Sequence, residues 1–480
     1  MKNLTPSILL DRTMDNLRDA WSGVSTQAGK ISRRLPALLG RPFRKLDPSL
    51  PPSAAGDMRD RIRDCLDGVG GAVSARARAA DLGRAYLELN SDGRQKFFSI
   101  LASDFGPHRD RVLEMADRLK QADGPDAALE AEHQLREALL SPRERLLTKF
   151  NSLPSGVKFL IDMRADLLSH TKDDPSLKNL DRDFGRLLRS WFDVGFLKME
   201  RVTWDAPAAI LEKLIAYEAV HEIESWDDLK DRLAQSRRCY AFFHPRIPEE
   251  PLIFVEVALV GEIARNVQVL LDRSAPRVPT GDATTAIFYS ISNTQEGLLG
   301  VSFGDFLIKQ VVEDLSQEMD NLKVFSTLSP IPGFRRWLEK EAQNPDQPRA
   351  ADFEAVLSAA ADQSSGTCDL AGFLDTDWHA DSKSHDQVRE PLTRLCAHYL
   401  SSTQSPGRSL DPVSRFHLTN GARIEHVNWM GDTSSKGLAQ SLGFMVNYRY
   451  VPDEIEENHE LYRSGEQVPM SNEVKNLLKM

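Results

Sequence analysis

The segment with the clearest chemical potential is Leu328-Ser-Pro-Ile-Pro-Gly-Phe334, which places a serine directly after a short apolar run. Proline fixes its own φ angle and restricts the residue before it, so we expect Ser329 to have little backbone freedom. Such rigid placement suits a hydroxyl that takes part in a reaction. The alternative interpretation is a serine that caps the turn or the helix that follows. Since no Gly-x-Ser-x-Gly elbow surrounds Ser329, the segment does not indicate a hydrolase nucleophile.

A second candidate is His417, in Phe416-His-Leu-Thr-Asn-Gly-Ala422. The ordinary pKa of a histidine, roughly 6.5, suits an acid or a base near neutral pH. Its apolar neighbours ahead of the turn signal Asn420-Gly421 fit a hydrogen-bonded core histidine equally well. The eleven histidines include no His-x-x-x-His or His-x-His pair, so the sequence predicts no zinc site.

A third candidate is an anion site in the turn that follows the predicted strand at 284–292. Gly297, Gly300 and Gly304 lie in or beside this turn, and an amphipathic helix follows it. A glycine-containing turn before a helix presents backbone N–H groups and the positive end of the helix dipole to a group such as a pyrophosphate. The spacing matches neither a P-loop nor a dinucleotide-binding fingerprint. An ordinary turn that needs glycines only for packing therefore remains the alternative.

The elements that would position these residues fall into two parts. From Met58 to about Arg189 the pattern is helical nearly throughout, with recurrent helix-start and turn signals, and it predicts a bundle. After Trp191, runs rich in β-branched and aromatic residues predict strands at 238–243, 252–260, 284–292, 324–328 and 444–450. Helices are expected at 207–219, 226–234, 303–318, 351–361 and 387–400. This alternation indicates a mixed sheet covered by helices.

The predicted organisation therefore has three segments. Residues 1–57 hold one amphipathic helix, with Leu10, Met14, Leu17 and Trp21 on its apolar stripe, and a linker rich in proline and basic residues. Residues 58–187 form the helical domain, and residues 188–480 form the domain that carries the candidate site.

Composition restricts the class of protein. In 480 residues, 60 Lys and Arg stand against 71 Asp and Glu, a net charge of −11, so no global positive field favours a nucleic-acid partner. No apolar stretch approaches the length of a membrane span, and the first residues lack the apolar core of a secretory signal. Four scattered cysteines, Cys65, Cys239, Cys368 and Cys396, are typical of thiols in a reducing compartment. We therefore expect a cytoplasmic protein that binds no membrane.

Beyond these patterns, the sequence resembles the malonyl-CoA decarboxylase family from about Phe97 to Tyr450. The most specific motifs are Leu-Ser-Pro-Ile-Pro-Gly-Phe at 328–334 and Phe-His-Leu-x-Asn-Gly-Ala at 416–422. The other matching motifs are Leu153-Pro-Ser-Gly-Val-Lys-Phe-Leu-Ile-Asp-Met-Arg-Ala-Asp166, Ala286-Ile-Phe-Tyr-Ser-Ile-Ser, Phe306-Leu-Ile-Lys, Asn428-Trp-Met and Asn447-Tyr-Arg-Tyr450.

The resemblance implies a fold and a set of roles. The fold would be α+β: an all-helical N-terminal bundle followed by an acetyltransferase-type mixed α/β catalytic domain. Ser329, His417 and Tyr450 would be the active-site residues. The loop that binds the CoA phosphates would consist of Leu299, Gly300, Val301, Ser302, Phe303, Gly304 and Asp305. Relatives often have an acid at position 302, so a role for the Ser302 side chain is in doubt.

The implied reaction converts malonyl-CoA to acetyl-CoA and CO2, a carboxy-lyase activity of fatty acid metabolism. Its thioester carbonyl already accepts the electrons, so we expect no metal, biotin or pyridoxal phosphate. The sequence ends in Leu-Leu-Lys-Met rather than a peroxisomal Ser-Lys-Leu, consistent with a cytoplasmic member. The resemblance also implies a homo-oligomer, a dimer or tetramer, which would form through the helical domain. Two alternatives remain open: an acyl-CoA-dependent acyltransferase, and a non-catalytic acyl-CoA sensor or scaffold.

Overall fold

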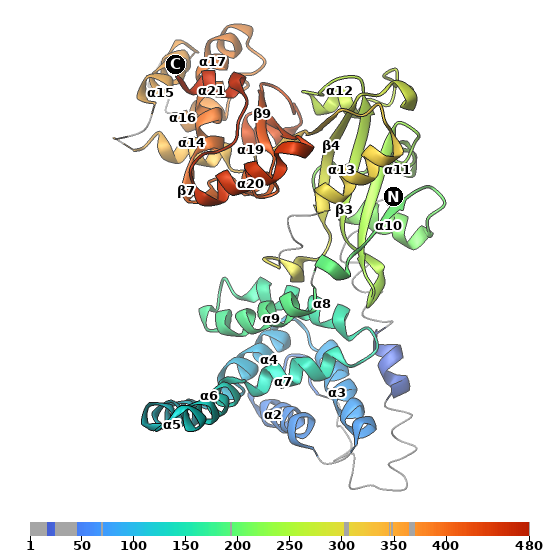
Figure 1. The fold of residues 1–480 in the computed structure, drawn as a ribbon, viewed down its shortest axis with the longest axis vertical. Coiled ribbons are helices and arrows are strands. Elements are labelled where there is room, and N and C mark those ends of the chain that lie inside the picture. The colour runs from blue at the N-terminus through green and yellow to red at the C-terminus, as the bar shows by residue number, and fades with distance from the viewer. Residues whose placement is uncertain are drawn as a thin grey trace. The chain divides into compact units, whose positions relative to one another are not determined.

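The structure is a computed structural model that describes residues 17–24, 46–68, 71–192, 194–301, 307–344, 346, 349–363 and 370–479. The chain divides into two compact units (Figure 1). The first is formed by described residues within 1–198, 242–252 and 293–303, and the second by those within 199–241, 253–292 and 304–480. Each unit is described by itself below.

The first unit is built from helices. They are α2 (Pro52–Asp67), α3 (Ala72–Leu87), α4 (Ser91–Asp104), α5 (Arg109–Gln121), α6 (Pro125–Leu139), α7 (Pro142–Asn151), α8 (Gly156–His170) and α9 (Lys178–Trp191). Their start signals act as the sequence predicts: the Asn90 side chain accepts from the Gly93 N–H to cap α4, and Ser141 and Glu144 form a capping box at α7. The short helix η2 (Pro175–Leu177) precedes α9.

Two boundaries differ from the sequence prediction. Helix α2 begins at Pro52, inside the segment predicted as linker, because a proline at the first helical position lacks only an N–H that would have no partner there. Helix α9 continues to Trp191, beyond residue 187, and buries Leu188 on its apolar face.

The core of the first unit is an aromatic cluster. Tyr86, Phe97 and Phe159 are fully buried, and Trp21 packs edge-on against Phe159 with 4.7 Å between ring centroids. The Trp21 indole N–H donates to the Pro154 carbonyl at 2.8 Å. The described part of the predicted N-terminal stripe therefore packs into this core; Leu10 and Met14 lie outside the described residues.

The chain also forms a mixed sheet. Its strands are β1 (Lys198–Val202), β2 (Arg237–His244), β3 (Ile247–Val260), β4 (Thr285–Asn293), β5 (Val324–Thr327), β6 (Ser329–Pro330), β9 (Arg423–Asn428) and β10 (Met445–Tyr450). They follow the order β1-β2-β3-β4-β5-β10-β6, and β9 also pairs with β10. Strands β4 and β5 are parallel, whereas β10 is antiparallel to β5, β6 and β9. The predicted α+β class, with helices first and a mixed sheet second, is confirmed.

Helices alternate with these strands, as predicted. They are α10 (Ala208–Tyr217), α11 (Trp226–Arg232), α12 (Val267–Leu271), α13 (Leu307–Glu318), α14 (Phe334–Glu341), α15 (Ala350–Gln363), α16 (Leu370–Leu374), α17 (Ser382–Ser401), α18 (Pro412–Thr419), α19 (Ser435–Ser441), α20 (Ile455–Ser464) and α21 (Asn472–Lys479). A small hairpin pairs β7 (Thr403–Ser405) with β8 (Arg408–Ser409). Strands β1, β6 and β9 have no counterpart in the sequence prediction, because they are short or rich in charged residues.

Three observations concern membrane spans, metal sites and the state of the cysteines. No helix in the described part of the chain is long and apolar enough to cross a membrane. Within the same residues, no group of three or more His, Cys, Asp or Glu side chains could hold a metal ion. Cys65, Cys239 and Cys396 are buried and unpaired, and burial raises the pKa of each thiol. Cys368 lies outside the described residues.

Candidate active site

Ser329 lies just after the residues of β5 that pair with β4. Strand β5 pairs with β4 up to Thr327 opposite Phe288, and the Leu328 N–H donates to the Phe288 carbonyl at 2.9 Å. The next residues, Ser329 and Pro330, form β6, which continues along β10 the antiparallel pairing that β5 already makes with that strand. The serine therefore lies just past the end of the β4–β5 pairing and is still held by β10, and only 6% of its surface is exposed. The structure places Ser329 just after β5, where the sequence analysis expected it.

His417 is placed by a short capped helix, α18. The Asp411 side chain accepts hydrogen bonds from the Val413 and Ser414 N–H groups, both at 2.9 Å, and Pro412 occupies the first helical position. These features start the helix one turn before the histidine. Asn420 ends the helix, as the sequence turn signal indicates. His417 is buried in the last turn, with 2% of its surface exposed.

The fold joins the three predicted active-site residues into one hydrogen-bonded chain. His417 Nε2 lies 3.1 Å from Ser329 Oγ, and His417 Nδ1 lies 2.8 Å from the phenol oxygen of Tyr450, on β10. The Ser329 hydroxyl donates to Thr327 Oγ1 at 2.9 Å. The histidine thus has a tyrosine, rather than a carboxylate, on its second nitrogen. This is not the arrangement of a Ser-His-Asp triad.

Burial determines the charge state of this chain. Desolvation lowers the pKa of His417 to about 3, because an imidazolium would lose its hydration here. Burial also raises the pKa of Tyr450 well above its usual value. The His417 ring stacks on Tyr448, with centroids 4.5 Å apart and planes 22° from parallel. At neutral pH the site therefore holds a neutral imidazole between two neutral hydroxyl groups.

Several supporting residues escaped the sequence analysis. The buried Asp411 carboxylate contacts the Tyr399 hydroxyl at 3.4 Å and accepts from the Gly333 N–H, so it links α18 to the turn after Ser329. The Asn447 side-chain amide donates to the Thr327 carbonyl at 2.6 Å and accepts from the Asn428 amide at 2.8 Å. Both asparagines lie in motifs that match the family, and this match is the sequence signal that could have indicated them.

The predicted CoA-phosphate loop is described only in part. Ser302, Phe303, Gly304 and Asp305 lie outside the described residues. Leu299 is 70% exposed, Val301 is buried, and Gly300 has a φ of 74°, in the left-handed region that favours glycine. These three belong to the first unit.

Helix α8 holds the start of this loop. Arg164 donates from Nη1 to the Gly297 carbonyl at 2.8 Å. A Cβ on Gly297 would stand 1.8 Å from the Ile161 carbonyl oxygen, so only glycine allows this approach. Gly297, the first glycine of the predicted turn, therefore packs against a helix, as the packing alternative proposed, whereas no described residue outside its chain neighbours lies within 4 Å of a Cβ built at Gly300.

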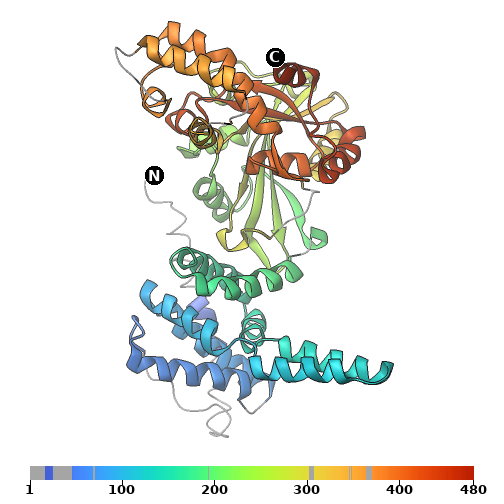
Figure 2. The ribbon, with the colours of Figure 1, turned by 90° about the vertical axis from the view of Figure 1, so that its left-hand side faces the viewer.

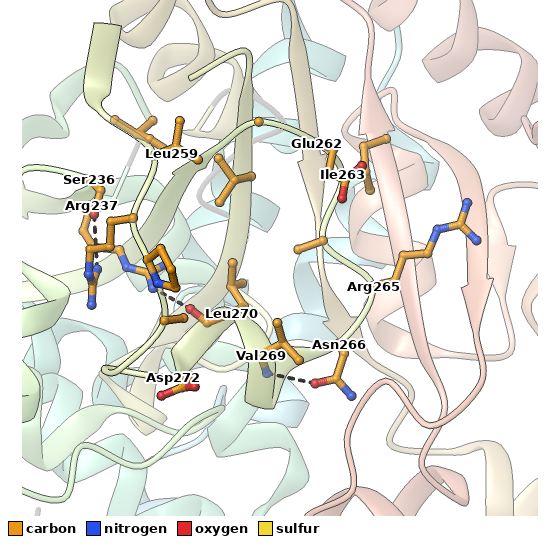
Figure 3. Close-up of a pocket in the computed structure, with 17 residues that line it drawn as sticks. Ser236, Arg237, Leu259, Glu262, Ile263, Arg265, Asn266, Val269, Leu270 and Asp272 are labelled. Atoms are coloured by element: carbon orange, nitrogen blue, oxygen red, sulfur yellow. Dashed lines mark hydrogen bonds between the residues drawn. The ribbon is translucent and has the colours of Figure 1, made fainter. Parts of the chain in front are cut away.

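Two of the cavities that the described residues line lie in the second unit. The larger, about 560 Å³, is lined mainly by apolar side chains between the ends of β2 and β3 and helix α12 (Figure 3). Its polar groups are largely engaged: Asn266 accepts from the Val269 N–H, and Arg277 pairs with Asp231. None of Ser329, His417 and Tyr450 lines it. A smaller cavity of about 220 Å³ is lined by Pro330 and Pro332, next to Ser329 along the chain, and by residues 219–221 and α19.

Comparisons with known proteins identify the family. A sequence model described as the malonyl-CoA decarboxylase C-terminal domain matches residues 195–480, and one described as the N-terminal domain matches residues 105–192. The chain belongs to the malonyl-CoA decarboxylase family. The mitochondrial malonyl-CoA decarboxylase of Anser anser anser is 36% identical over 474 residues, 95% of this chain and 91% of that protein. That of Mus musculus is 37% identical over 460 residues, 90% of this chain and 89% of that protein.

Solved structures of malonyl-CoA decarboxylases agree. The structure from Rhodopseudomonas palustris is 41% identical with a TM-score of 0.80, and it covers 88% of this chain and 99% of its own. The structure from Agrobacterium vitis is 39% identical with a TM-score of 0.78, with the same coverage. The junction between the two malonyl-CoA decarboxylase domains falls at residues 192–195, directly after α9.

Proposed function

We propose that this chain converts malonyl-CoA to acetyl-CoA and CO2, and that Ser329, His417 and Tyr450 act at the malonyl end. Family membership supports the carboxy-lyase activity. The observation that carries the residue roles is the buried chain from Tyr450 through His417 to Ser329.

The reaction needs few chemical groups. Loss of CO2 leaves the electron pair of the broken C–C bond on the α-carbon, where the thioester carbonyl delocalises it as an enolate. The α-carbon then takes one proton, so each turnover consumes one proton from solvent. No metal, biotin or pyridoxal phosphate is required. The protein must hold the carboxylate out of the carbonyl plane, remove part of its hydration and deliver the proton.

The hydrogen-bonded chain suits these tasks. The Ser329 hydroxyl orients the carboxylate or an enolate oxygen. His417 supplies the proton, directly or through Ser329, and Tyr450 fixes its ring and returns a proton to Nδ1. Because the imidazole is neutral and buried, His417 adds no positive charge that would stabilise the substrate carboxylate before it leaves. The site therefore favours the enolate over the starting carboxylate.

The same geometry argues against a serine nucleophile. Thioester hydrolysis through Ser329 would require its hydroxyl to donate to His417 Nε2, whereas here it donates to Thr327. An acyltransferase would in addition need a pocket for an acceptor substrate beside Ser329. A non-catalytic sensor would have no use for a buried Ser-His-Tyr chain.

The remaining parts of the proposal concern CoA binding, self-association and cellular location. We assign the CoA phosphates to the loop at 299–305. We also propose self-association through the helical domain, a cytoplasmic location and a role in fatty acid metabolism. The buried, unpaired thiols support a reducing compartment; the relatives from Anser anser anser and Mus musculus are named as mitochondrial proteins.

The decisive experiment incubates the pure protein with malonyl-CoA and measures acetyl-CoA and CO2. We expect stoichiometric formation of both, before and after dialysis against a chelator. Free CoA and malonate would instead show hydrolysis, and binding without turnover would show a sensor. Loss of activity on chelation, restored by one metal, would contradict the cofactor-free mechanism. The Ser329→Ala variant serves as the control for contaminating activity.

A further inference from the structure

Thr327 lies next to the candidate active site and is held there by several hydrogen bonds. It ends β5 and is completely buried. Its Oγ1 accepts from the Ser329 hydroxyl at 2.9 Å and from the Tyr448 backbone N–H at 3.1 Å. Its carbonyl accepts from the Asn447 amide at 2.6 Å. The hydroxyl oxygen of Thr327 therefore faces two donors, and a backbone N–H fixes its position.

These contacts set the direction of every hydrogen bond in the chain. A serine hydroxyl has one hydrogen, and here that hydrogen points to Thr327. The Ser329 oxygen must then meet His417 Nε2 as an acceptor, so Nε2 carries the ring hydrogen. Nδ1 is left with a lone pair, which accepts from the Tyr450 phenol. The order of donors is Tyr450, His417, Ser329, Thr327.

Without the Thr327 hydroxyl, nothing fixes this order of hydrogen-bond donors. The Ser329 hydrogen would turn to the remaining acceptor in reach, His417 Nε2. The ring hydrogen would then move to Nδ1 and point to the Tyr450 oxygen. Serine would face histidine as a donor, as in a nucleophilic serine, and its oxygen would no longer be polarised by the histidine N–H.

We propose that Thr327 is a positioning residue that selects the Nε2–H tautomer of His417 and keeps Ser329 as an acceptor from His417. This inference rests on the proposed function for its kinetic consequence. When substrate enters, its oxygen takes the place of Thr327 as acceptor for the Ser329 hydrogen, while the His417 N–H still donates to Ser329. The protein thereby holds Ser329 ready to donate to the substrate rather than to attack it.

The first test reads the tautomer directly and needs no turnover. In protein labelled with 15N-histidine, the two ring nitrogens of His417 give different chemical shifts according to which carries the hydrogen; His417→Asn assigns the signals. We expect Nε2 protonated and Nδ1 bare in the parent and in Thr327→Ser. Thr327→Val, which keeps the shape but lacks the hydroxyl, should shift the hydrogen to Nδ1. A parent with Nδ1 protonated, or an unchanged tautomer in Thr327→Val, would overturn the inference.

The second test is kinetic. Thr327→Val should lower kcat by roughly 10- to 100-fold, the scale of a misplaced reacting group, with little change in KM for malonyl-CoA. Thr327→Ser should restore most of kcat. The matched control is Thr285→Val, which removes a buried threonine hydroxyl on β4 at the other end of its pairing with β5. Equal loss of kcat in Thr285→Val, or in Thr327→Ser, would contradict the assignment.

Failure of the proposed function and failure of the Thr327 inference give different results. If the parent does not form acetyl-CoA, the proposed function fails, while the 15N experiment still reports whether Thr327 sets the tautomer. Circular dichroism and the affinity for acetyl-CoA confirm in each variant that the fold is retained.

Discussion

At the scale of single residues, the site depends on the absence of charge. Among the residues that the structure describes, no carboxylate contacts His417 Nδ1, and the ring forms its hydrogen bonds with hydroxyl groups. In the proposed reaction this relay passes the negative charge of the enolate to the Tyr450 oxygen, which then takes a proton from solvent, and no buried imidazolium forms. The relay suits a reaction in which the substrate itself supplies the negative charge.

The first prediction separates chemistry from binding at these residues. Ser329→Ala and His417→Asn should each lower kcat by roughly 10²- to 10⁴-fold, the usual scale for a positioned acid or base. The affinity for acetyl-CoA should barely change, because neither residue is assigned to the CoA moiety. Steady-state rates and calorimetry check both parts. Normal turnover by His417→Asn would show that the assignment is wrong.

The second prediction follows from the low pKa of His417. Its folded-state value, about 3, lies below the ordinary value of 6.5. Between pH 6.5 and 3 the unfolded state therefore binds a proton that the folded state does not, so the free energy of unfolding falls as the pH falls. For this group the loss is about 1.4 kcal/mol per pH unit, or about 2 kcal/mol from neutral pH to pH 5.

Denaturant titrations of the parent and of His417→Gln at pH 7 and pH 5 measure this effect. The parent should lose more stability than the variant over this interval. In the parent, no step in kcat above pH 5 should belong to His417. A direct titration of His417 by NMR with a midpoint near 6.5 would refute the prediction.

At the scale of elements, short capped segments set the geometry. Asp411 starts α18 and also reaches the turn that follows Ser329, through Gly333 and Tyr399. One buried carboxylate thus ties the helix of the histidine to the turn of the serine.

The third prediction tests this link. Asp411→Asn keeps an oxygen that can accept from the Val413 and Ser414 N–H groups, but its amide nitrogen cannot accept from Gly333. We expect kcat to fall at least tenfold with a modest loss of stability. Asp411→Ala should in addition cost about 1 kcal/mol for the lost cap. Asn90→Ala, which removes the cap of α4 in the first unit, is the control and should reduce stability without reducing kcat.

The fourth prediction concerns the CoA loop. Gly300→Asp introduces a carboxylate where an anion is expected to approach the backbone, and should weaken malonyl-CoA and acetyl-CoA alike. Among the described residues other than its chain neighbours, no atom lies within 4 Å of a Cβ built at Gly300, so steric overlap with them does not contribute. Gly300→Asn is the matched control, because asparagine has the same shape and also tolerates a positive φ. Equal calorimetric affinities for the aspartate and asparagine variants would remove the anion site from Gly300.

At the scale of the whole molecule, the helical unit shows apolar surface that its own core does not use. Helices α5 and α6 pack on each other as a hairpin that extends away from the other helices of the unit (Figure 2). Leu113 on α5 is 55% exposed and Leu129 on α6 is 67% exposed. Burial of such side chains against a second copy would be favourable.

The fifth prediction is that the intact chain self-associates through its helical domain. Sedimentation should show a dimer or a tetramer, and Leu113→Glu combined with Leu129→Glu should shift the equilibrium towards monomer. A matched control exchanges Glu114 and Glu130, next to these leucines, for glutamine. A monomer at every concentration of the parent would contradict the prediction.

Much of the architecture can be read from the sequence, because local signals decide it. Helix caps such as Asn90 and Ser141 mark helix starts, and runs rich in β-branched and aromatic residues mark β2 to β5. The two prolines around Ile331 show that Ser329 is rigid. The resemblance to the family supplied the role of each active-site residue, including Tyr450, for which no local pattern gives a role.

Only the tertiary structure decided what surrounds the reacting groups. Ser329 and His417 are 88 residues apart, and their contact requires β6 and α18 to meet at β10. The role of Thr327 follows from a backbone N–H on another strand. The low pKa of His417 arises from burial, to which aromatic side chains far along the sequence, such as Tyr448, contribute. Periodicity and capping act over a few residues along the chain, whereas desolvation and hydrogen-bond direction depend on every group that the fold brings within a few ångströms.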